Sequence, residues 1–355
     1  MKILISALAA LAILPPAAGQ ENPAATPVPR RPTTSVLAIQ GTRFLLDGKP
    51  FYFQGLSFFN ALYNKEFNKS PESREKTLRR FKSYGITSLR IWGDWRLTNG
   101  WIDECPGCSL YVYPEMEGRD RRFEPRKPRL NPDAVARLKD LLAAADKQGM
   151  VIELALFSHY MVYPVETRNE YIRLITDELR SYRNVFFEIW NEYCESVVDH
   201  TRLIKWLDPL RLVGNSPGSS SVKATHAENV VLDILCPHTT RRTSKGNFWE
   251  IAPLEIRQLV EAYQKPVIDD EPARCGIRDF GGNENTKMEW HLAQNAAVRK
   301  YGGYHNYHHD MFQLPYGNAP TPPNGIPDPE FSKFHLQAFE YLRSIAPPEI
   351  IKSAR

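Results

Sequence analysis

From residue 52 to residue 345, short strand-like runs alternate with helical segments, and this alternation constrains the fold more than any other feature of the chain. Helix starts at Ser70-Pro71 and Asn131-Pro132 separate the runs, because Ser or Asn caps a helix whose first turn contains Pro. Eight βα units in one unbroken series favour a closed barrel over a doubly wound sheet. We therefore predict an α/β protein with a (β/α)8 TIM barrel, whose strands lie at residues 52–56, 87–92, 150–157, 185–190, 210–213, 230–236, 267–270 and 302–305.

The segment that precedes the barrel contains a hairpin signal. Residues 36–57 alternate in character and include the pair Asp47-Gly48. An Asp-Gly pair is typical of the two-residue turn between antiparallel strands. We predict a short N-terminal β-hairpin that closes the bottom of the barrel.

The first 35 residues have the features of an exported protein. Residues 1–19 combine Lys2, an apolar run from Ile3 to Leu14 and small residues before Gln20, which is typical of a secretory signal peptide. The apolar run is short for a bilayer span, so an uncleaved membrane anchor is the less favoured alternative. Residues 20–35 are rich in Pro, Ala and Thr and predict a tether. Residues 36–355 then form one barrel domain of a secreted or periplasmic protein, with no membrane attachment after cleavage.

Charge and cysteine content narrow the class of protein further. The formal net charge is +4 and there is no long Lys/Arg block, so we expect no nucleic-acid partner. Export permits disulfides, and five cysteines leave at least one unpaired or paired between chains. We predict a small loop closed by Cys105 and Cys108. Two of Cys194, Cys236 and Cys275 are expected to form a second bridge, with Cys236–Cys275 the preferred pair.

The fourth and seventh predicted strands each stop at a carboxylate, Glu192 and Glu271. In a barrel of this type, catalytic side chains lie just past the carboxyl ends of the strands. Strands four and seven lie on opposite sides of an eight-stranded mouth, so the two glutamates are expected to face each other. A facing pair of carboxylates is the arrangement that cleaves glycosidic bonds. Asp269 and Asp270 are rivals of Glu271 if the strand ends one or two residues earlier.

Two motifs give this pattern a family resemblance. Trp190-Asn191-Glu192 and Ile268-Asp269-Asp270-Glu271-Pro272 resemble the strand ends of clan A glycoside hydrolases, retaining (β/α)8 enzymes that include cellulases, mannanases and β-glucuronidase-like proteins. Asp47-Gly48-Lys49-Pro50-Phe51 and Ser88-Leu89-Arg90-Ile91-Trp92 are also similar, and the resemblance covers residues 36–345. It implies that Glu192 is the acid/base and Glu271 the nucleophile, that Asn191 holds the sugar 2-hydroxyl, and that Arg90 supports the nucleophile.

Further substrate contacts follow less directly. His238 lies past strand six and His159 near the end of strand three, where the family carries histidines. Trp95, beyond strand two, is a candidate platform for the apolar face of a sugar. Where the family usually has a Trp on strand eight, this chain offers Tyr304 and Tyr307.

A metal site is not expected on strand eight, although His305, His308 and His309 are close in sequence. Consecutive residues of a strand point to opposite faces, so His308 and His309 cannot both face inward. A zinc-dependent hydrolase is an alternative that depends on these histidines alone.

Taken together, the sequence and the resemblance predict a secreted retaining glycoside hydrolase. It would cleave a β-linked oligo- or polysaccharide by double displacement with two glutamates, without cofactor or metal. The alternative is a non-catalytic carbohydrate-binding protein on the same barrel. The altered strand-eight aromatic and the Asp269-Asp270 pair motivate that alternative. The sugar, the linkage and the oligomeric state stay open.

Overall fold

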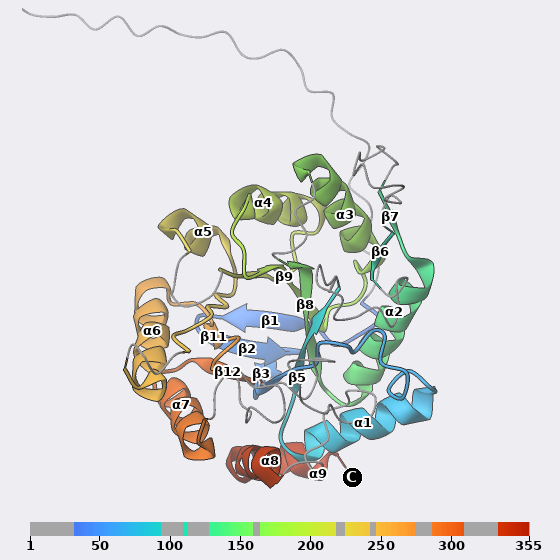
Figure 1. Ribbon diagram of the computed structural model, residues 1–355. Helices are drawn as coiled ribbons and strands as arrows, with labels where there is room; N and C mark the ends of the chain where they lie inside the picture. The colour runs from blue at the N-terminus through green and yellow to red at the C-terminus, as the bar shows by residue number, and fades with distance from the viewer. Residues whose placement is uncertain are drawn as a thin grey trace, which may run out of the picture. The chain divides into compact units, whose positions relative to one another are not determined.

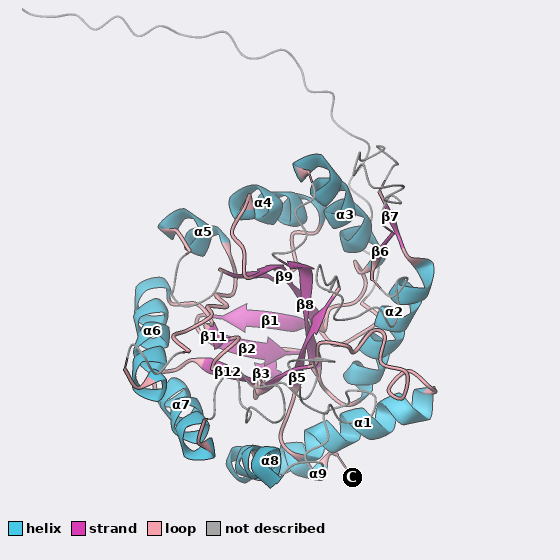
Figure 2. Cartoon of the chain, in the orientation of Figure 1, coloured by secondary structure: helices cyan, strands magenta, loops and turns pink. Residues whose placement is uncertain are grey.

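A parallel seven-stranded sheet curls at the centre of the structure, and helices surround it (Figures 1 and 2). This computed structural model describes residues 32–93, 109–112, 128–158, 164–217, 224–241, 246–273, 286–308 and 333–354. In spatial order the strands are β10 (Val213–Ser216), β9 (Val185–Asn191), β8 (Val151–Ser158), β5 (Ser88–Trp92), β4 (Gly55–Ser57), β12 (Tyr304–Tyr307) and β11 (Ile268–Asp269). Every pairing in this sheet is parallel. The predicted α/β, TIM-like architecture is thus confirmed.

The described helices follow the strands along the chain. They are α1 (Pro71–Ser83), α2 (Pro132–Lys147), α3 (Val165–Glu178), α4 (Val197–Leu207), α5 (His226–Val231), α6 (Phe248–Tyr263), α7 (Met288–Lys300), α8 (Lys333–Ile345) and α9 (Pro348–Lys352). The Ser70 and Asn131 side chains accept hydrogen bonds from the first turns of α1 and α2, as the sequence predicts. Among the described helices, none combines the length and the apolar character that a membrane span needs.

The strand predicted at residues 230–236 is wrong. His226–Val231 is helix α5, whose start carries a capping box between Thr225 and Glu228. Beyond it, Leu235 forms an isolated parallel bridge with Val267, and the Ile234 amide donates to the Val213 carbonyl. This segment therefore lies between β10 and β11, but it is too short to count as a strand of the described sheet.

The predicted hairpin is part of a larger element. β1 (Leu37–Gln40), β2 (Arg43–Leu46) and β3 (Lys49–Pro50) form a three-stranded antiparallel sheet. Asp47 and Gly48 connect β2 to β3 with φ values of 50° and 75°, which a two-residue primed turn requires. A separate pair of short strands, β6 (Tyr111–Val112) and β7 (Arg129–Leu130), lies outside the main sheet.

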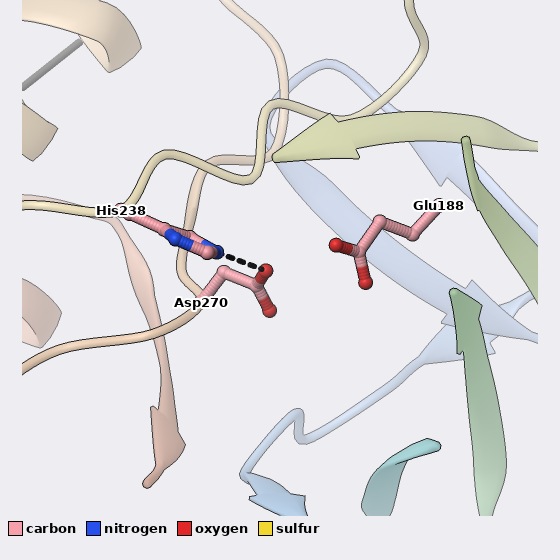
Figure 3. Close-up of side chains that lie close together, drawn as sticks. All are labelled: Glu188, His238 and Asp270. Carbon is pink, nitrogen blue, oxygen red and sulfur yellow. Dashed lines mark ion pairs between the residues drawn. The ribbon is translucent and has the colours of Figure 1, made fainter. Parts of the chain in front are cut away.

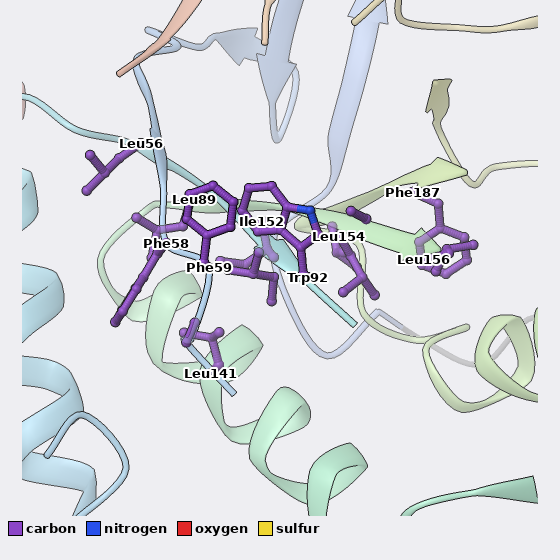
Figure 4. Close-up of a cluster of buried hydrophobic side chains, with 14 of the residues drawn as sticks. Leu56, Phe58, Phe59, Leu89, Trp92, Leu141, Ile152, Leu154, Leu156 and Phe187 are labelled. Atoms are coloured by element: carbon purple, nitrogen blue, oxygen red, sulfur yellow. The ribbon is translucent and has the colours of Figure 1, made fainter. Parts of the chain in front are cut away.

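Both faces of the curled sheet are buried, and they carry different cores. On the concave face, apolar side chains of the strands meet the N-terminal sheet in a cluster of Leu37, Phe44, Phe53, Val151, Phe186, Ile234, Cys236 and Ile268. The convex face packs against the helices through residues such as Leu89, Ile152 and Leu154. Figure 4 also shows the stacked rings of Phe59 and Trp92; Trp92 shares strand parity with Arg90 and packs on its guanidinium, so this pair lies beside the inward-facing side chains. Continuous apolar runs such as that of β8 follow from burial on both sides.

Several predictions fall on residues that the structure does not describe. The signal peptide (1–19), most of the tether (20–35), His159 and Trp95 lie outside the described residues, and so do Cys105, Cys108 and Cys275. Cys236 is described, and it is a buried free thiol. The preferred Cys236–Cys275 disulfide is therefore wrong, because the Cys236 side chain belongs to the concave core.

Candidate active site

Above the apolar cluster, the concave face carries a layer of buried charged side chains. Glu153 follows Val151 by two positions on β8, and Glu188 follows Phe186 by two positions on β9, so each shares the face of its apolar neighbour. Arg90 of β5 lies in the same layer. Glu153, Glu188 and Arg90 have no solvent exposure. The strand alternation that predicts the core therefore also predicts which charges point inward.

Arg90 is the centre of this layer. Its Nε donates to Glu188 Oε2 over 2.8 Å, and its Nη2 lies 3.0 Å from Asp270 Oδ2. Its Nη1 donates to Glu271 Oε2 over 3.0 Å, and its Nη2 donates to Asn191 Oδ1 over 2.7 Å. Burial opposes the charge of Arg90, but the carboxylates around it raise its pKa well above the ordinary value. The structure thus brings together three predicted site residues, Arg90, Asn191 and Glu271.

Asn306 of β12 connects two further carboxyl groups. Its Nδ2 donates to Glu153 Oε2 over 2.9 Å and to Asp270 Oδ1 over 2.7 Å. Gly55 leaves room for this side chain, since a Cβ at position 55 would lie 1.4 Å from Asn306 Oδ1. Burial, the first cause in each case, raises the pKa of Glu188 to about 7 and that of Glu153 well above its ordinary value. Burial therefore favours the protonated forms of these two carboxyl groups.

Glu192 and Glu271 meet at the open side of this layer. Together with His238 they place one oxygen or nitrogen atom each within 4.8 Å of the others. His238 Nδ1 lies 3.4 Å from Glu192 Oε1, and His238 Nε2 lies 3.5 Å from Glu271 Oε2. Arg241 reaches both glutamates, with Nη2 3.2 Å from Glu192 Oε1 and Nη1 3.0 Å from Glu271 Oε1.

The surroundings lower the pKa of both glutamates below the ordinary value. Burial acts to raise the pKa of Glu271, but the neighbouring cations, led by Arg241 and His238, hold it well below the ordinary value. Burial and the charge of Glu271 act to raise the pKa of Glu192, yet the hydrogen bond and charge of His238, with Arg241, lower it. His238 responds in the opposite sense, because burial lowers its pKa and the charge of Glu271 raises it above the ordinary value overall.

The same side chains form two sets with the donor atoms of a metal site. One set is Glu192, His238 and Glu271, and the other is Glu188, His238 and Asp270. Figure 3 shows the His238 imidazole and the Asp270 carboxylate, joined by a 3.6 Å contact, on the side toward which Glu188 points. In each set an arginine already contacts the carboxylates. Arg90 contacts Glu188 and Asp270, and Arg241 contacts Glu192 and Glu271.

The backbone of β9 is irregular where the site begins. Its register with β10 shifts between Gly214 and Ser216, which turns Asn191 toward Arg90. Glu192 then adopts φ of 64°, in the left-handed region that few non-glycine residues occupy. Because of the register shift and the left-handed residue, the consecutive side chains of Asn191 and Glu192 both lie in the candidate site.

Three neighbouring acids at the end of β11 take different directions. Asp269 points to the convex side, where Thr239 Oγ1 donates to it over 2.7 Å and Gln294 Nε2 over 2.6 Å. Burial raises its pKa to about 7. Asp270 lies fully buried in the charged layer, while the Glu271 side chain is 6% exposed. Of the three, Glu271 is therefore the carboxylate placed beside Glu192.

The two strand-eight tyrosines do not reach this site. The ring of Tyr304 packs on Phe44, and its hydroxyl donates to the Thr42 carbonyl at the N-terminal sheet. Tyr307 points to the convex side, where its hydroxyl lies 2.8 Å from His335 Nδ1. The predicted sugar contacts of Tyr304 and Tyr307 are wrong for this reason. His308 faces the site instead, with Nε2 3.5 Å from Glu271 Oε1.

Four residues described above are absent from the sequence-based prediction: Glu153, Glu188, Asn306 and Arg241. The first three have a signal, since each shares strand parity with an inward-facing residue. Arg241 lies in a loop three residues after His238 and has none.

Comparisons with known proteins bear on the fold. No protein-family model and no curated protein sequence matches the chain. A solved structure from Bacteroides vulgatus, assigned as a glycoside hydrolase, superposes with a TM-score of 0.64 at 17% identity and covers 88% of this chain. The chain spans 61% of the length of that protein.

Two further structures agree. A glycoside hydrolase family 5 protein from Bacteroides vulgatus has a TM-score of 0.58 at 14% identity, with 89% of this chain and 73% of the other covered. A β-1,4-D-mannanase from Cryptopygus antarcticus has a TM-score of 0.55 at 12% identity, with 87% and 95% covered. At these identities the likeness concerns the fold, and it shows that this chain shares the fold of these glycoside hydrolases.

Proposed function

We propose that this chain is a secreted retaining glycoside hydrolase that cleaves a β-linked oligo- or polysaccharide at the open end of a (β/α)8 barrel. The observation that carries the proposal is the approach of Glu192 and Glu271, which place oxygen atoms within 4.8 Å of each other. Carboxyl groups about 5–5.5 Å apart are typical of retaining enzymes, and inverting enzymes separate them further to admit water. The glycoside hydrolases with this fold support the proposal.

In the proposed first step, a carboxylate oxygen of Glu271 attacks the anomeric carbon. The bond from that carbon to the leaving oxygen breaks, and protonated Glu192 gives its proton to that oxygen. The low pKa of Glu271 suits this role, because a nucleophile must be ionised. Arg90 is a positioning residue that holds Glu271 through Nη1.

In the second step, the Glu192 carboxylate takes a proton from water, and the water oxygen displaces Glu271 from the anomeric carbon. Asn191 and His238 lie beside the two glutamates and are positioned to contact the sugar hydroxyls. The chain's own side chains carry out each proton transfer.

The experiment uses the protein from Gln20 onward with Glu192→Ala, Glu271→Gln and, as a control, the exposed Glu261→Gln on α6. β-Glucans, β-mannans, xylans and galactans are tested as substrates, together with aryl glycosides whose leaving groups differ in pKa. Product anomers are followed by NMR. We expect retained configuration, and activity lost to background in Glu271→Gln.

The Glu192→Ala variant distinguishes an acid catalyst from a residue that merely supports the fold. Loss of general acid catalysis lowers rates by roughly 10²–10⁴-fold. An aryl glycoside with a good leaving group needs no proton in the first step, so we expect its glycosylation rate to be spared. Equal losses on all leaving groups, or inverted products, would contradict the proposed mechanism.

One observation favours the second candidate, a non-catalytic carbohydrate-binding protein. Arg241 pairs with both glutamates, and such pairing keeps Glu192 from carrying the proton that an acid needs. Saccharide binding by calorimetry without turnover of any substrate, in protein of native thermal stability, would establish this candidate instead.

Export is a separate part of the proposal. It predicts that the chain expressed with residues 1–19 in a secreting host is found outside the cytoplasm with a mass that lacks those residues. Full-length protein in the cytoplasm would contradict it.

A further inference from the structure

Arg241 occupies the space between the two glutamates. Its Nη1 lies 3.0 Å from Glu271 Oε1, and its Nη2 lies 3.2 Å from Glu192 Oε1 and 2.5 Å from His238 Nδ1. Its side chain is 20% exposed, so it forms part of the surface that a substrate would meet. A sugar that is attacked by Glu271 and protonated by Glu192 must contact the same two carboxylates. The guanidinium and the sugar therefore compete for one position.

Moving Arg241 aside requires an alternative acceptor. A guanidinium leaving two carboxylates loses its partners in a largely buried site, and such a loss is costly unless another acceptor replaces them. The hydroxyl groups of a neutral sugar supply no negative charge. A substrate carboxylate matches the fork of a guanidinium and forms the short, charge-assisted hydrogen bonds that neutral groups do not.

Arg241 also has an unused hydrogen-bond donor. Among the described residues, its Nε is buried and has no hydrogen-bond partner. The charges around the glutamates also favour an anionic ligand. Four basic side chains lie within 3.5 Å of Glu271: Arg90, Arg241, His238 and His308. The site is thus rich in cationic or protonatable groups where a sugar would bind.

We propose that the saccharide bound between Glu192 and Glu271 carries a carboxylate at or next to the cleaved bond, as a uronic acid does, and that Arg241 is the specificity-determining residue that binds it. The inference rests on the proposed glycosidase function and names its substrate class.

Binding of such a substrate would have a second effect on the same site. When Arg241 turns to the substrate carboxylate, Glu192 loses one of the cations that lower its pKa. The groups that remain around it are Glu271, which raises the pKa, and His238, which lowers it. Departure of Arg241 therefore favours the protonated form of Glu192 that the first step needs.

The test compares sugars that differ only in the group at C6. The probes are 4-nitrophenyl β-glucoside against β-glucuronide, and β-1,4-linked trisaccharides of glucose against glucuronic acid and of mannose against mannuronic acid. Each is assayed for turnover and, by calorimetry, for binding to wild-type protein. The variants are Arg241→Met, Arg241→Lys and the control Arg202→Met, an exposed arginine of α4.

We expect wild-type protein to favour at least one uronate over its neutral partner by roughly 10–100-fold, the effect of hydrogen bonds to a charged group. Arg241→Met should remove that preference without a matching loss on the neutral sugar. Arg241→Lys should keep part of the preference, because the charge remains and the planar fork is lost. Arg202→Met should leave both values unchanged.

The outcomes separate this inference from the proposed function. Turnover of neutral sugars alone, with Arg241→Met lowering every rate equally, would overturn the inference and leave the glycosidase standing. Uronate binding that depends on Arg241 without any turnover would support the specificity and reject the glycosidase. Absence of uronate binding by folded wild-type protein would overturn the inference outright.

Discussion

Replacement of Asp269 by Asn should stabilise the protein at alkaline pH and much less at acid pH. The Asp269 carboxyl is fully buried, and its pKa is raised to about 7. An aspartate in the unfolded chain has a pKa of about 3.9. A folded-state pKa above the unfolded value contributes stability that is present below the unfolded pKa and lost as pH rises through the folded one.

The magnitude follows from the two pKa values. At about 1.4 kcal/mol per pKa unit, the raised pKa of Asp269 lowers the free energy of unfolding by about 4 kcal/mol near pH 8 and about 1.5 kcal/mol near pH 5, relative to very acid pH. An Asn side chain does not ionise, so the variant should gain about 2.5 kcal/mol relative to wild type between these pH values. Thr239 can turn its hydroxyl to accept from the new amide, while Gln294 still donates to its oxygen.

Urea-induced unfolding, followed by tryptophan fluorescence at both pH values, measures this gain. Asp199→Asn is the matched control, because it makes the same substitution at a side chain of α4 that is 78% exposed. Effects common to both pH values, such as altered packing, cancel in the difference. A stability difference between Asp269→Asn and wild type that stays constant, or shrinks as pH rises, would refute the reasoning.

Two substitutions and one labelling experiment test the layers beneath the candidate site. Arg90→Met should lower the free energy of unfolding by about 3–5 kcal/mol in urea titrations, because it leaves buried carboxylates without their cation; a loss below about 1 kcal/mol would show that the charged layer tolerates its removal. Gly55→Ala should cost about 1–3 kcal/mol in thermal unfolding, since its Cβ overlaps Asn306, and an unchanged melting temperature would contradict that packing. Burial raises the Cys236 pKa well above the ordinary thiol value, so an alkylating reagent should label Cys236 only after unfolding. Mass spectrometry of peptides measures this labelling, and a Cys236–Cys275 cross-linked peptide would contradict the free thiol.

The sequence predicts best the strands whose apolar runs stop at a polar residue. β5, β8 and β9 lie where the alternation places them, because strands buried on both faces are unbroken apolar runs. The positions of Glu192 and Glu271 follow from the same signal. Their approach to each other depends on the curl of the sheet, which no local pattern contains.

The segment before β11 shows a competing local signal. Apolar residues from 230 to 236 favour a strand, but Thr225 and Glu228 are three residues apart and form a capping box, which starts helix α5. The cap decides the conformation of the first half of the segment, and the strand pairing survives only at Leu235. The Thr225–Glu228 spacing is the sequence signal for this helix.

Side chains of β12, and of His308 directly after it, show that strand parity predicts the face of the sheet but not what surrounds a side chain. Tyr304, Asn306 and His308 share the concave face, and their depth in the curled sheet decides their surroundings: the apolar cluster for Tyr304, the charged layer for Asn306, and the mouth for His308. Aromatic character suggests sugar contact for Tyr304, but depth excludes it. The role of Arg241 depends on the course of a loop, which residue identities do not specify.

The left-handed backbone of Glu192 has a consequence for substitution at this position. A non-glycine residue in this conformation costs about 1–2 kcal/mol, and glycine adopts it without that cost. A mutation from Glu to Gly at this position thus relieves strain at the moment it abolishes the carboxylate. The same change removes a carboxylate that pairs with His238 and Arg241, so relief of backbone strain and loss of these ion pairs oppose each other at residue 192.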